Sequence, residues 1–91
     1  MAKWIRFVQV GASPSGVTRI WEVRTVDGLH VLARIAWSTA WRKYELRPDF
    51  DTGWEQDCLR DVADFLEAQT REHKASRAAT RIAAQEEGHR G

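Results

Sequence analysis

The sequence predicts an α+β fold, in which a four-stranded antiparallel sheet, arranged as a meander, packs on one C-terminal helix. Three observations predict it. Within residues 3–47, four short segments show the alternation of strands; it is imperfect in the first, which carries apolar side chains on both faces. Short connections join these segments, and Asp27-Gly28 is the strongest turn signal, because both residues tolerate positive φ. After Thr52 the apolar spacing changes to that of a helix.

The four strands are expected at residues 3–10, 17–25, 29–37 and 41–47. The second strand alternates most cleanly, with Trp21 and Val23 on one face. The run 11–16 contains two glycines and a proline and is expected to be a loop. The side chains that we expect the sheet to place in the core are those of Trp21, Trp37, Tyr44 and Leu46.

The helix that follows must cover the apolar face of the sheet. Two signals mark its start: Thr52 with Glu55 fits a capping box, and Asp57 adds a carboxylate where the helix dipole favours one. The apolar stripe consists of Cys58, Leu59, Val62, Phe65 and Leu66.

One domain is expected over residues 1–71, followed by a tail of alanine and charged residues over 72–91. No proline or glycine occurs from Trp54 through Glu87, so the helix can continue into the tail and overhang the sheet. The alternative is a disordered tail. A helical tail could dock on a partner or form a homodimer with a second copy.

Length and composition limit the class of protein. At 91 residues with a net charge of +1, the chain makes one small domain without a strong electrostatic preference. The single cysteine, Cys58, excludes an internal disulfide and favours a reducing compartment. No apolar run is long enough for a signal peptide or a membrane span, so we expect a cytoplasmic protein without a membrane partner.

No motif predicts catalysis, a metal site or a cofactor. The three histidines are scattered, and none stands at metal-ligand spacing with Cys58. Cys58 lies on the apolar face of the expected helix, where free cysteines behave as small hydrophobic residues. The run 11–16 lacks the lysine and the spacing of a phosphate-binding loop. We therefore expect a non-enzymatic protein.

Five tryptophans are unusual for this length. Trp21 and Trp37 fit the core, whereas Trp41 and Trp54 lie at the ends of elements and are harder to bury. Tryptophan and arginine are enriched at interface hot spots. We expect a partner-binding surface that includes Trp41, Arg42, Lys43, Arg47 and Trp54. A protein partner is favoured, because the basic excess is small and is partly balanced by nearby acids.

Part of the chain also resembles a family of small uncharacterised proteins of actinobacterial phages and prophages. The resemblance covers about residues 17–70. It rests on a tryptophan-containing hairpin, Trp41-Arg42-Lys43-Tyr44, Pro48, and the run Cys58-Leu59-Arg60-Asp61-Val62-Ala63-Asp64-Phe65. Members often carry Asn-Pro ahead of the helix, where this chain has Glu55-Gln56.

The resemblance implies a phage accessory protein that binds a host protein and modulates it in the host cytoplasm. The alternative is a nucleic-acid-binding protein that contacts the phosphate backbone through Arg24, Arg34, Arg42, Lys43 and Arg47. A third hypothesis is a component of the virion or of its assembly.

Overall fold

The computed structural model describes the backbone of residues 4–89 and the side chains of residues 4–79. Its strands are β1 (Ile5–Ala12), β2 (Arg19–Thr25), β3 (Val31–Ser38) and β4 (Lys43–Pro48), and its helix is α1 (Gln56–His89). The strands form one sheet in the order β1-β2-β3-β4, and every neighbouring pair is antiparallel. Both the α+β class and the meander predicted from the sequence are confirmed.

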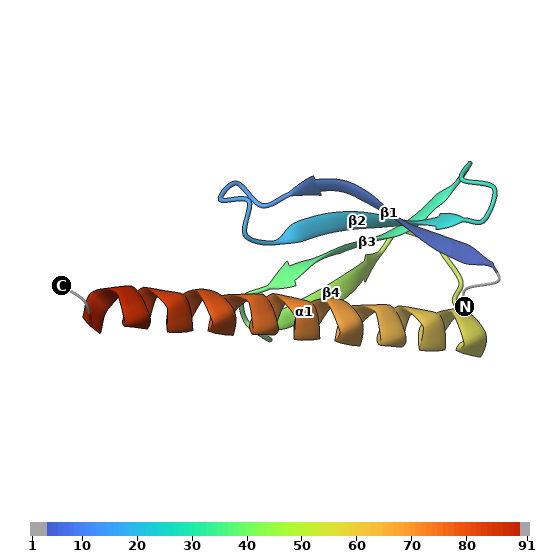
Figure 1. Ribbon diagram of the computed structural model, residues 1–91. Coiled ribbons are helices and arrows are strands. Elements are labelled where there is room, and N and C mark those ends of the chain that lie inside the picture. The colour runs from blue at the N-terminus through green and yellow to red at the C-terminus, as the bar shows by residue number, and fades with distance from the viewer. Residues whose placement is uncertain (1–3, 90–91) are drawn as a thin grey trace.

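The helix covers one face of the sheet and leaves the other uncovered. Figure 1 shows α1 beneath the sheet, lying nearest β4 and continuing past the end of the strands. The register places Trp21 opposite Ile35 and Trp37 opposite Tyr44, so alternate residues from all four strands face the helix. The buried core consists of Ile5, Trp21, Val23, Ala33, Ile35, Tyr44, Cys58 and Val62.

Aromatic rings join the two layers. Phe65 of α1 stacks on Phe7 with ring centroids 4.0 Å apart and meets Trp21 edge to face at 5.1 Å. Tyr44 contacts Trp21 at 5.1 Å and Trp37 at 5.2 Å, again edge to face. Each such pair contributes about 0.5–1.5 kcal/mol beyond its buried area. Trp21 and Tyr44 are buried as expected, while Trp37 and Leu46 are half-buried against the core.

The helix also protects the outer edge of the sheet. β4 is an edge strand, whose unpaired backbone groups could bind another chain. Here the Tyr44 N–H donates to the Thr70 hydroxyl of α1 at 3.1 Å. The Tyr44 hydroxyl in turn accepts the Arg19 N–H at 3.1 Å. These bonds fix the start of β4 between the start of β2 and the middle of α1.

The structure corrects the expected start of the helix. α1 begins at Gln56, and Glu55 caps it by accepting the Cys58 N–H at 2.6 Å. Thr52 forms no capping box, because its hydroxyl donates to the Asp49 carbonyl and accepts the Trp54 indole N–H. Hydrogen bonds from the Cys58 side chain and backbone hold the pKa of Glu55 below its usual value.

Two further expectations were wrong in detail. The run 11–16 is not entirely loop, because a bulge after Gln9 lets Gly11 and Ala12 continue β1 opposite Ile20 and Arg19. Leu59 lies off the apolar stripe and is 50% exposed. The turn of the helix that points Cys58 and Val62 at the sheet points Leu59 toward its flank.

The helix passes residue 71 without a break and extends through Gly88 to His89. The sequence left a helical and a disordered tail as alternatives. As far as residue 89, the backbone of the tail is helical. A homodimer through the tail would use mostly side chains beyond residue 79, which lie outside the described residues. As far as it is described, α1 does not combine the length and hydropathy that crossing a membrane requires.

Candidate functional site

The site is built on the turn between β3 and β4. Ser38, itself buried, closes this turn twice: its carbonyl accepts the Arg42 N–H at 2.8 Å, and its hydroxyl accepts the Trp41 N–H at 3.2 Å. The turn therefore holds Trp41 outward, and the side chain is 74% exposed. An indole fixed at a turn in this way loses little further backbone freedom when it binds a partner.

Arg42 adopts a backbone conformation that is unfavourable for its residue type. Its φ is 55°, in the left-handed region where glycine is usual. A non-glycine residue there costs about 1–2 kcal/mol. Such outliers occur at turns as well as at functional sites, and the described residues contain a second one, Asp51 with a φ of 61°, outside the site. The role of Arg42 therefore depends on the surroundings of its side chain.

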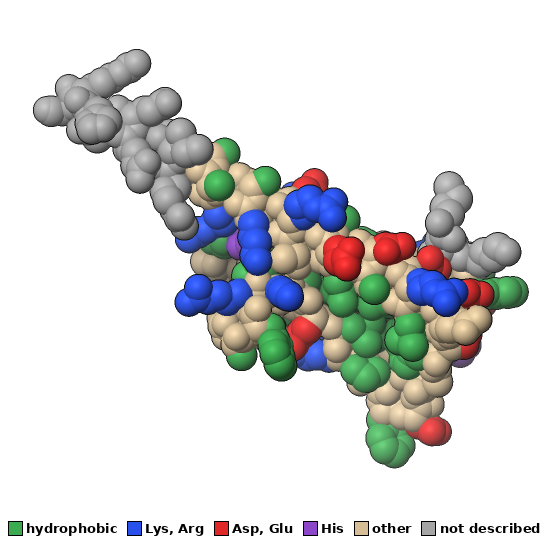
Figure 2. Space-filling view, turned by 90° about the horizontal axis from the view of Figure 1, so that it is seen from below, with side chains coloured by type: hydrophobic (Ala, Val, Ile, Leu, Met, Phe, Trp, Pro, Cys, Tyr) green, Lys and Arg blue, Asp and Glu red, His purple; other side chains and the backbone are tan. Residues whose placement is uncertain are grey.

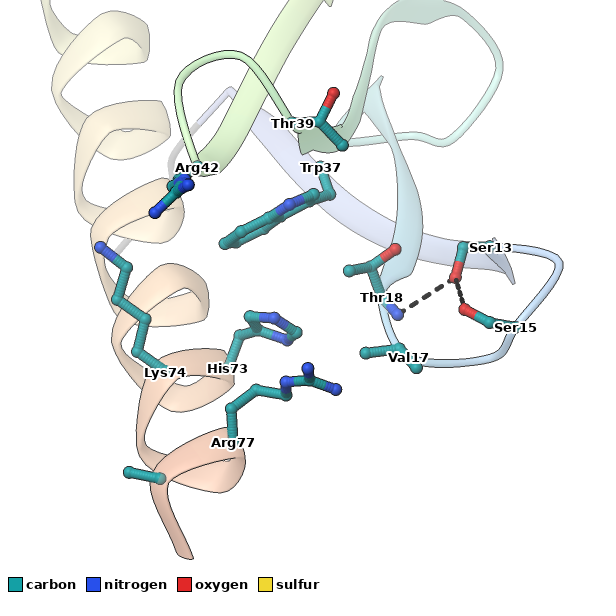
Figure 3. Close-up of a pocket in the computed structure, with 11 residues that line it drawn as sticks. Ser13, Ser15, Val17, Thr18, Trp37, Thr39, Arg42, His73, Lys74 and Arg77 are labelled. Carbon is teal, nitrogen blue, oxygen red and sulfur yellow. Dashed lines mark hydrogen bonds between the residues drawn. The ribbon is translucent and has the colours of Figure 1, made fainter. Parts of the chain in front are cut away.

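The guanidinium lines a groove of about 840 Å³, here called the Trp37 groove. The groove lies where the β1–β2 loop, the β3–β4 turn and α1 meet (Figure 3). Its lining residues are Ser13, Ser15, Val17, Thr18, Trp37, Thr39, Arg42, His73, Lys74, Arg77 and Ala78. The rings of Trp37 and His73 lie against each other in it, with centroids 4.4 Å apart.

The β1–β2 wall of the groove is held by its own hydrogen bonds. The Ser13 hydroxyl accepts the Thr18 N–H at 3.2 Å and lies 3.3 Å from the Ser15 hydroxyl. The Ser13 N–H donates to the Thr18 carbonyl at 2.9 Å, and its carbonyl accepts the Gly16 N–H at 2.8 Å. Gly16 has a φ of 75°, which only glycine adopts readily. This loop is a fixed wall.

A second groove, of about 520 Å³, runs between β4 and α1 and is called the Thr70 groove. Lys74 lines both grooves, so they meet at its side chain. Together they bring to one side of the molecule five basic residues, which we call the cationic rim: Arg42, Lys43, Arg71, Lys74 and Arg77. Figure 2 shows basic side chains gathered toward the end from which the helix leaves the sheet.

The rim differs from the other basic residues in its pairing. On the uncovered face of the sheet, Arg24 pairs with Glu22, and Arg47 pairs with Glu45 at 2.8 Å. Among the side chains of residues 4–79, no rim residue has an ion pair. Within residues 4–79, no acidic residue lines the Trp37 groove, and Glu67 is the one acid that lines the Thr70 groove. Among these side chains the rim therefore carries an excess of positive charge.

The structure brings together only part of the residues proposed from the sequence. Trp41, Arg42 and Lys43 lie at the site. Arg47 lies with Arg34 on the uncovered sheet face, where the two strands pair them. Trp54 lies at the far end of β4, half-buried against the core, with its N–H on Thr52 at 3.1 Å. Of the two tryptophans expected to resist burial, only Trp41 is largely exposed.

Sequence reasoning missed the contribution of α1. Arg71, Lys74 and Arg77 are spaced by three residues and so lie along one side of a helix, a signal that was available. Lys74 and Arg77 fall within the tail expected over residues 72–91, and nothing in the local pattern places any of the three beside Arg42.

The charges of the site suit an anionic ligand more than a cationic one. The described residues contain no group of three or more side chains suited to hold a metal ion. Cys58 is remote from the rim on the buried face of α1, and burial, with the nearby Glu55, raises the pKa of its thiol to about 11. Comparison with protein-family models, with curated proteins and with solved structures found no match to this chain.

Proposed function

We propose that the protein is a non-enzymatic binding protein and that its partner is single-stranded nucleic acid. The observation that carries the proposal is the cationic rim, five basic residues without ion-pair partners among the described side chains; the exposed Trp41, which lines neither groove, precedes Arg42 in the same turn. The resemblance to phage proteins supports a role in the cytoplasm of an infected host.

Each part of the site matches a feature of such a strand. Arginine and lysine bind phosphate oxygens, and aromatic rings stack on bases whatever their sequence. Bases in a duplex are already stacked on their neighbours, so a ring at the tip of a turn favours a single strand. The apolar floor of the Thr70 groove, formed by the half-buried Leu66 over the buried Tyr44, adds surface between the cations.

The uncovered sheet face is the weaker candidate for the same partner. It carries Arg24, Arg34 and Arg47, but two of these are paired with glutamates. A phosphate would have to displace Glu22 or Glu45, whereas it displaces no described carboxylate at the Trp37 groove. These pairings favour the helix side as the binding surface for the nucleic acid.

Fluorescence anisotropy with a labelled oligothymidylate of about 12 nucleotides tests the proposal. If all five rim residues neutralise phosphates, a plot of the logarithm of the association constant against the logarithm of the salt concentration has a slope of about −3.5. The affinity should thus fall about 100-fold between about 50 and about 200 mM salt. Absence of binding at the lower salt concentration, or a flat response to salt, would refute it.

A pair of double variants separates the rim from net charge. Lys74→Gln with Arg77→Gln and Arg6→Gln with Arg60→Gln remove the same charge, but only the first pair lies on the rim. At physiological salt, screening limits the electrostatic effect of an exposed charge to a distance of about 8 Å. The second variant should therefore bind nearly as the wild type does. Equal losses in both variants would show that the rim is not the site.

A host protein is the second candidate partner, as the resemblance to phage accessory proteins implies. The observation that favours it is the 74% exposure of Trp41, since tryptophan is enriched at hot spots between proteins. Affinity purification from host lysate with the wild type and with Trp41→Ala tests it. Recovery of the same proteins by both would remove this candidate.

A further inference from the structure

We propose that the Trp37 groove holds one phosphate group, bound by Arg42, Lys74 and Arg77 against the β1–β2 loop. This inference rests on the proposed function, because the phosphate would belong to the bound strand, and it assigns a particular place to one of the strand's phosphates. Nothing in the sequence pattern marks this site, since its residues come from three elements.

The charges of the groove favour a compact anion. Figure 3 shows Arg42 and Lys74 on one side of the Trp37 ring and Arg77 reaching from α1 toward the β1–β2 loop. The three cations line one groove, with the Trp37 and His73 rings between Arg77 and the other two, and no carboxylate of residues 4–79 lines it. A bound anion would offset their charge, and the long side chain of Arg77 can turn toward it.

The arrangement of donors favours phosphate over carboxylate. Cations approach from α1 and from the β3–β4 turn, and Thr18 and Thr39 also line the groove, where a turn of each side chain about χ1 would bring its hydroxyl toward a ligand. Neither of these hydroxyls makes a hydrogen bond within the described residues. A carboxylate presents two oxygens in one plane, whereas a tetrahedral phosphate presents oxygens in several directions and accepts from all these donors.

The walls of the groove are fixed before a ligand arrives. The hydrogen bonds of Ser13 hold the β1–β2 loop, and Ser38 holds the turn that carries Arg42. Contact of His73 with Trp37 fixes the helix beside them. Binding therefore orders mainly the long side chains, which keeps its entropic cost low.

The first experiment uses inorganic phosphate as the probe. Backbone amide shifts of the full chain are followed by NMR at constant ionic strength, with acetate as the control anion. Saturable shifts around Thr18, Thr39, Arg42 and Lys74 are expected with phosphate and not with acetate. They should disappear in Lys74→Gln with Arg77→Gln and persist in Arg6→Gln with Arg60→Gln. Equal shifts with acetate, or none that saturate, would overturn the inference.

The second experiment identifies the source of the phosphate. Oligothymidylates with and without a 5′-phosphate are compared on the wild type and on the Lys74/Arg77 variant. A severalfold preference for the phosphorylated strand that the variant loses assigns the groove to a terminal phosphate. If the wild type binds the two oligothymidylates equally and the variant binds both more weakly, the groove holds an internal phosphodiester.

The two proposals fail in different ways. Salt-dependent binding of oligonucleotides without any phosphate response in the groove would overturn this inference and leave the proposed function standing. Saturable phosphate binding in a protein that binds no oligonucleotide would support the site and overturn the proposed function.

Discussion

Replacement of Arg42 by glycine separates the fold from the site, because the two should respond in opposite directions. The φ of Arg42 is 55°, which glycine adopts without strain. The substitution removes an exposed side chain that has no ion pair within residues 4–79. It leaves intact the Arg42 N–H bond to the Ser38 carbonyl, because that bond is made by the backbone.

The expected change in stability is a small gain. Relief of the left-handed conformation stabilises the folded protein by about 1–2 kcal/mol. The greater freedom of glycine in the unfolded chain opposes this by about 0.5–1 kcal/mol. The free energy of unfolding should rise by about 0–1.5 kcal/mol, the difference of these ranges. For a domain of this size, 1 kcal/mol corresponds to a Tm shift of about 4–8 °C.

The expected change in binding is a loss. Without the guanidinium, the affinity for oligothymidylate should fall about tenfold, which corresponds to about 1.4 kcal/mol. The slope of affinity against salt should become shallower by about 0.7, one phosphate contact on a single strand. The matched control is Arg42→Lys, which keeps both the charge and the strained backbone and should retain most of the salt dependence.

Urea denaturation followed by circular dichroism and anisotropy titration of the same preparations give the two readings. A destabilisation above about 1 kcal/mol would mean that the Arg42 side chain supports the fold, as ordinary core and network changes do. Higher stability with unchanged affinity would remove Arg42 from the site. Either result would refute the link between the backbone outlier and binding.

Three further changes test the rest of the structure. Trp21→Ala should lower the free energy of unfolding by about 3–5 kcal/mol in urea denaturation, and a loss below about 1 kcal/mol would contradict the core position of the ring. Thr70→Val should cost about 1 kcal/mol by removing the acceptor of the Tyr44 N–H, whereas an unchanged midpoint would show that this edge bond is not needed. Burial raises the pKa of Cys58 from 9.0 to about 11, so the unfolded chain loses its thiol proton first and stability should fall as pH rises across that interval. The Cys58→Ala variant should lose less stability than the wild type over this pH range. Identical dependence of the unfolding free energy on pH in the wild type and the variant would contradict the raised pKa.

Much of the fold could be predicted from local pattern because the pattern reports the periodicity of each element. Alternation around Trp21 and Val23 identified β2, and Asp27-Gly28 located the turn to β3; Gly28 has a φ of 79°. Boundaries were less secure where a local signal competed with pairing. Gly11 joins β1 because β2 offers partners beyond a bulge. Thr52 does not cap α1, because its hydroxyl binds Asp49 and Trp54 instead.

The candidate site could be predicted only in part. Trp41 and Arg42 stood out because a tryptophan beside basic residues at the end of a strand has no place in a simple core. Their location beside the second half of α1 depends on the direction in which the helix crosses the sheet. That direction is set by the contacts of Val62 and Phe65 with the sheet, which join residues distant in sequence.

The sequence by itself determined the order of the elements, the face of the sheet that is buried and the isolation of Trp41, since each follows from spacing along a short segment. Only the tertiary structure decided that Arg42 meets Lys74 and Arg77 across a groove, and that Arg24 and Arg47 are paired with glutamates instead. The physical reason is that packing fixes which charges become neighbours. Whether a basic residue is neutralised or left open for an anion depends on those neighbours.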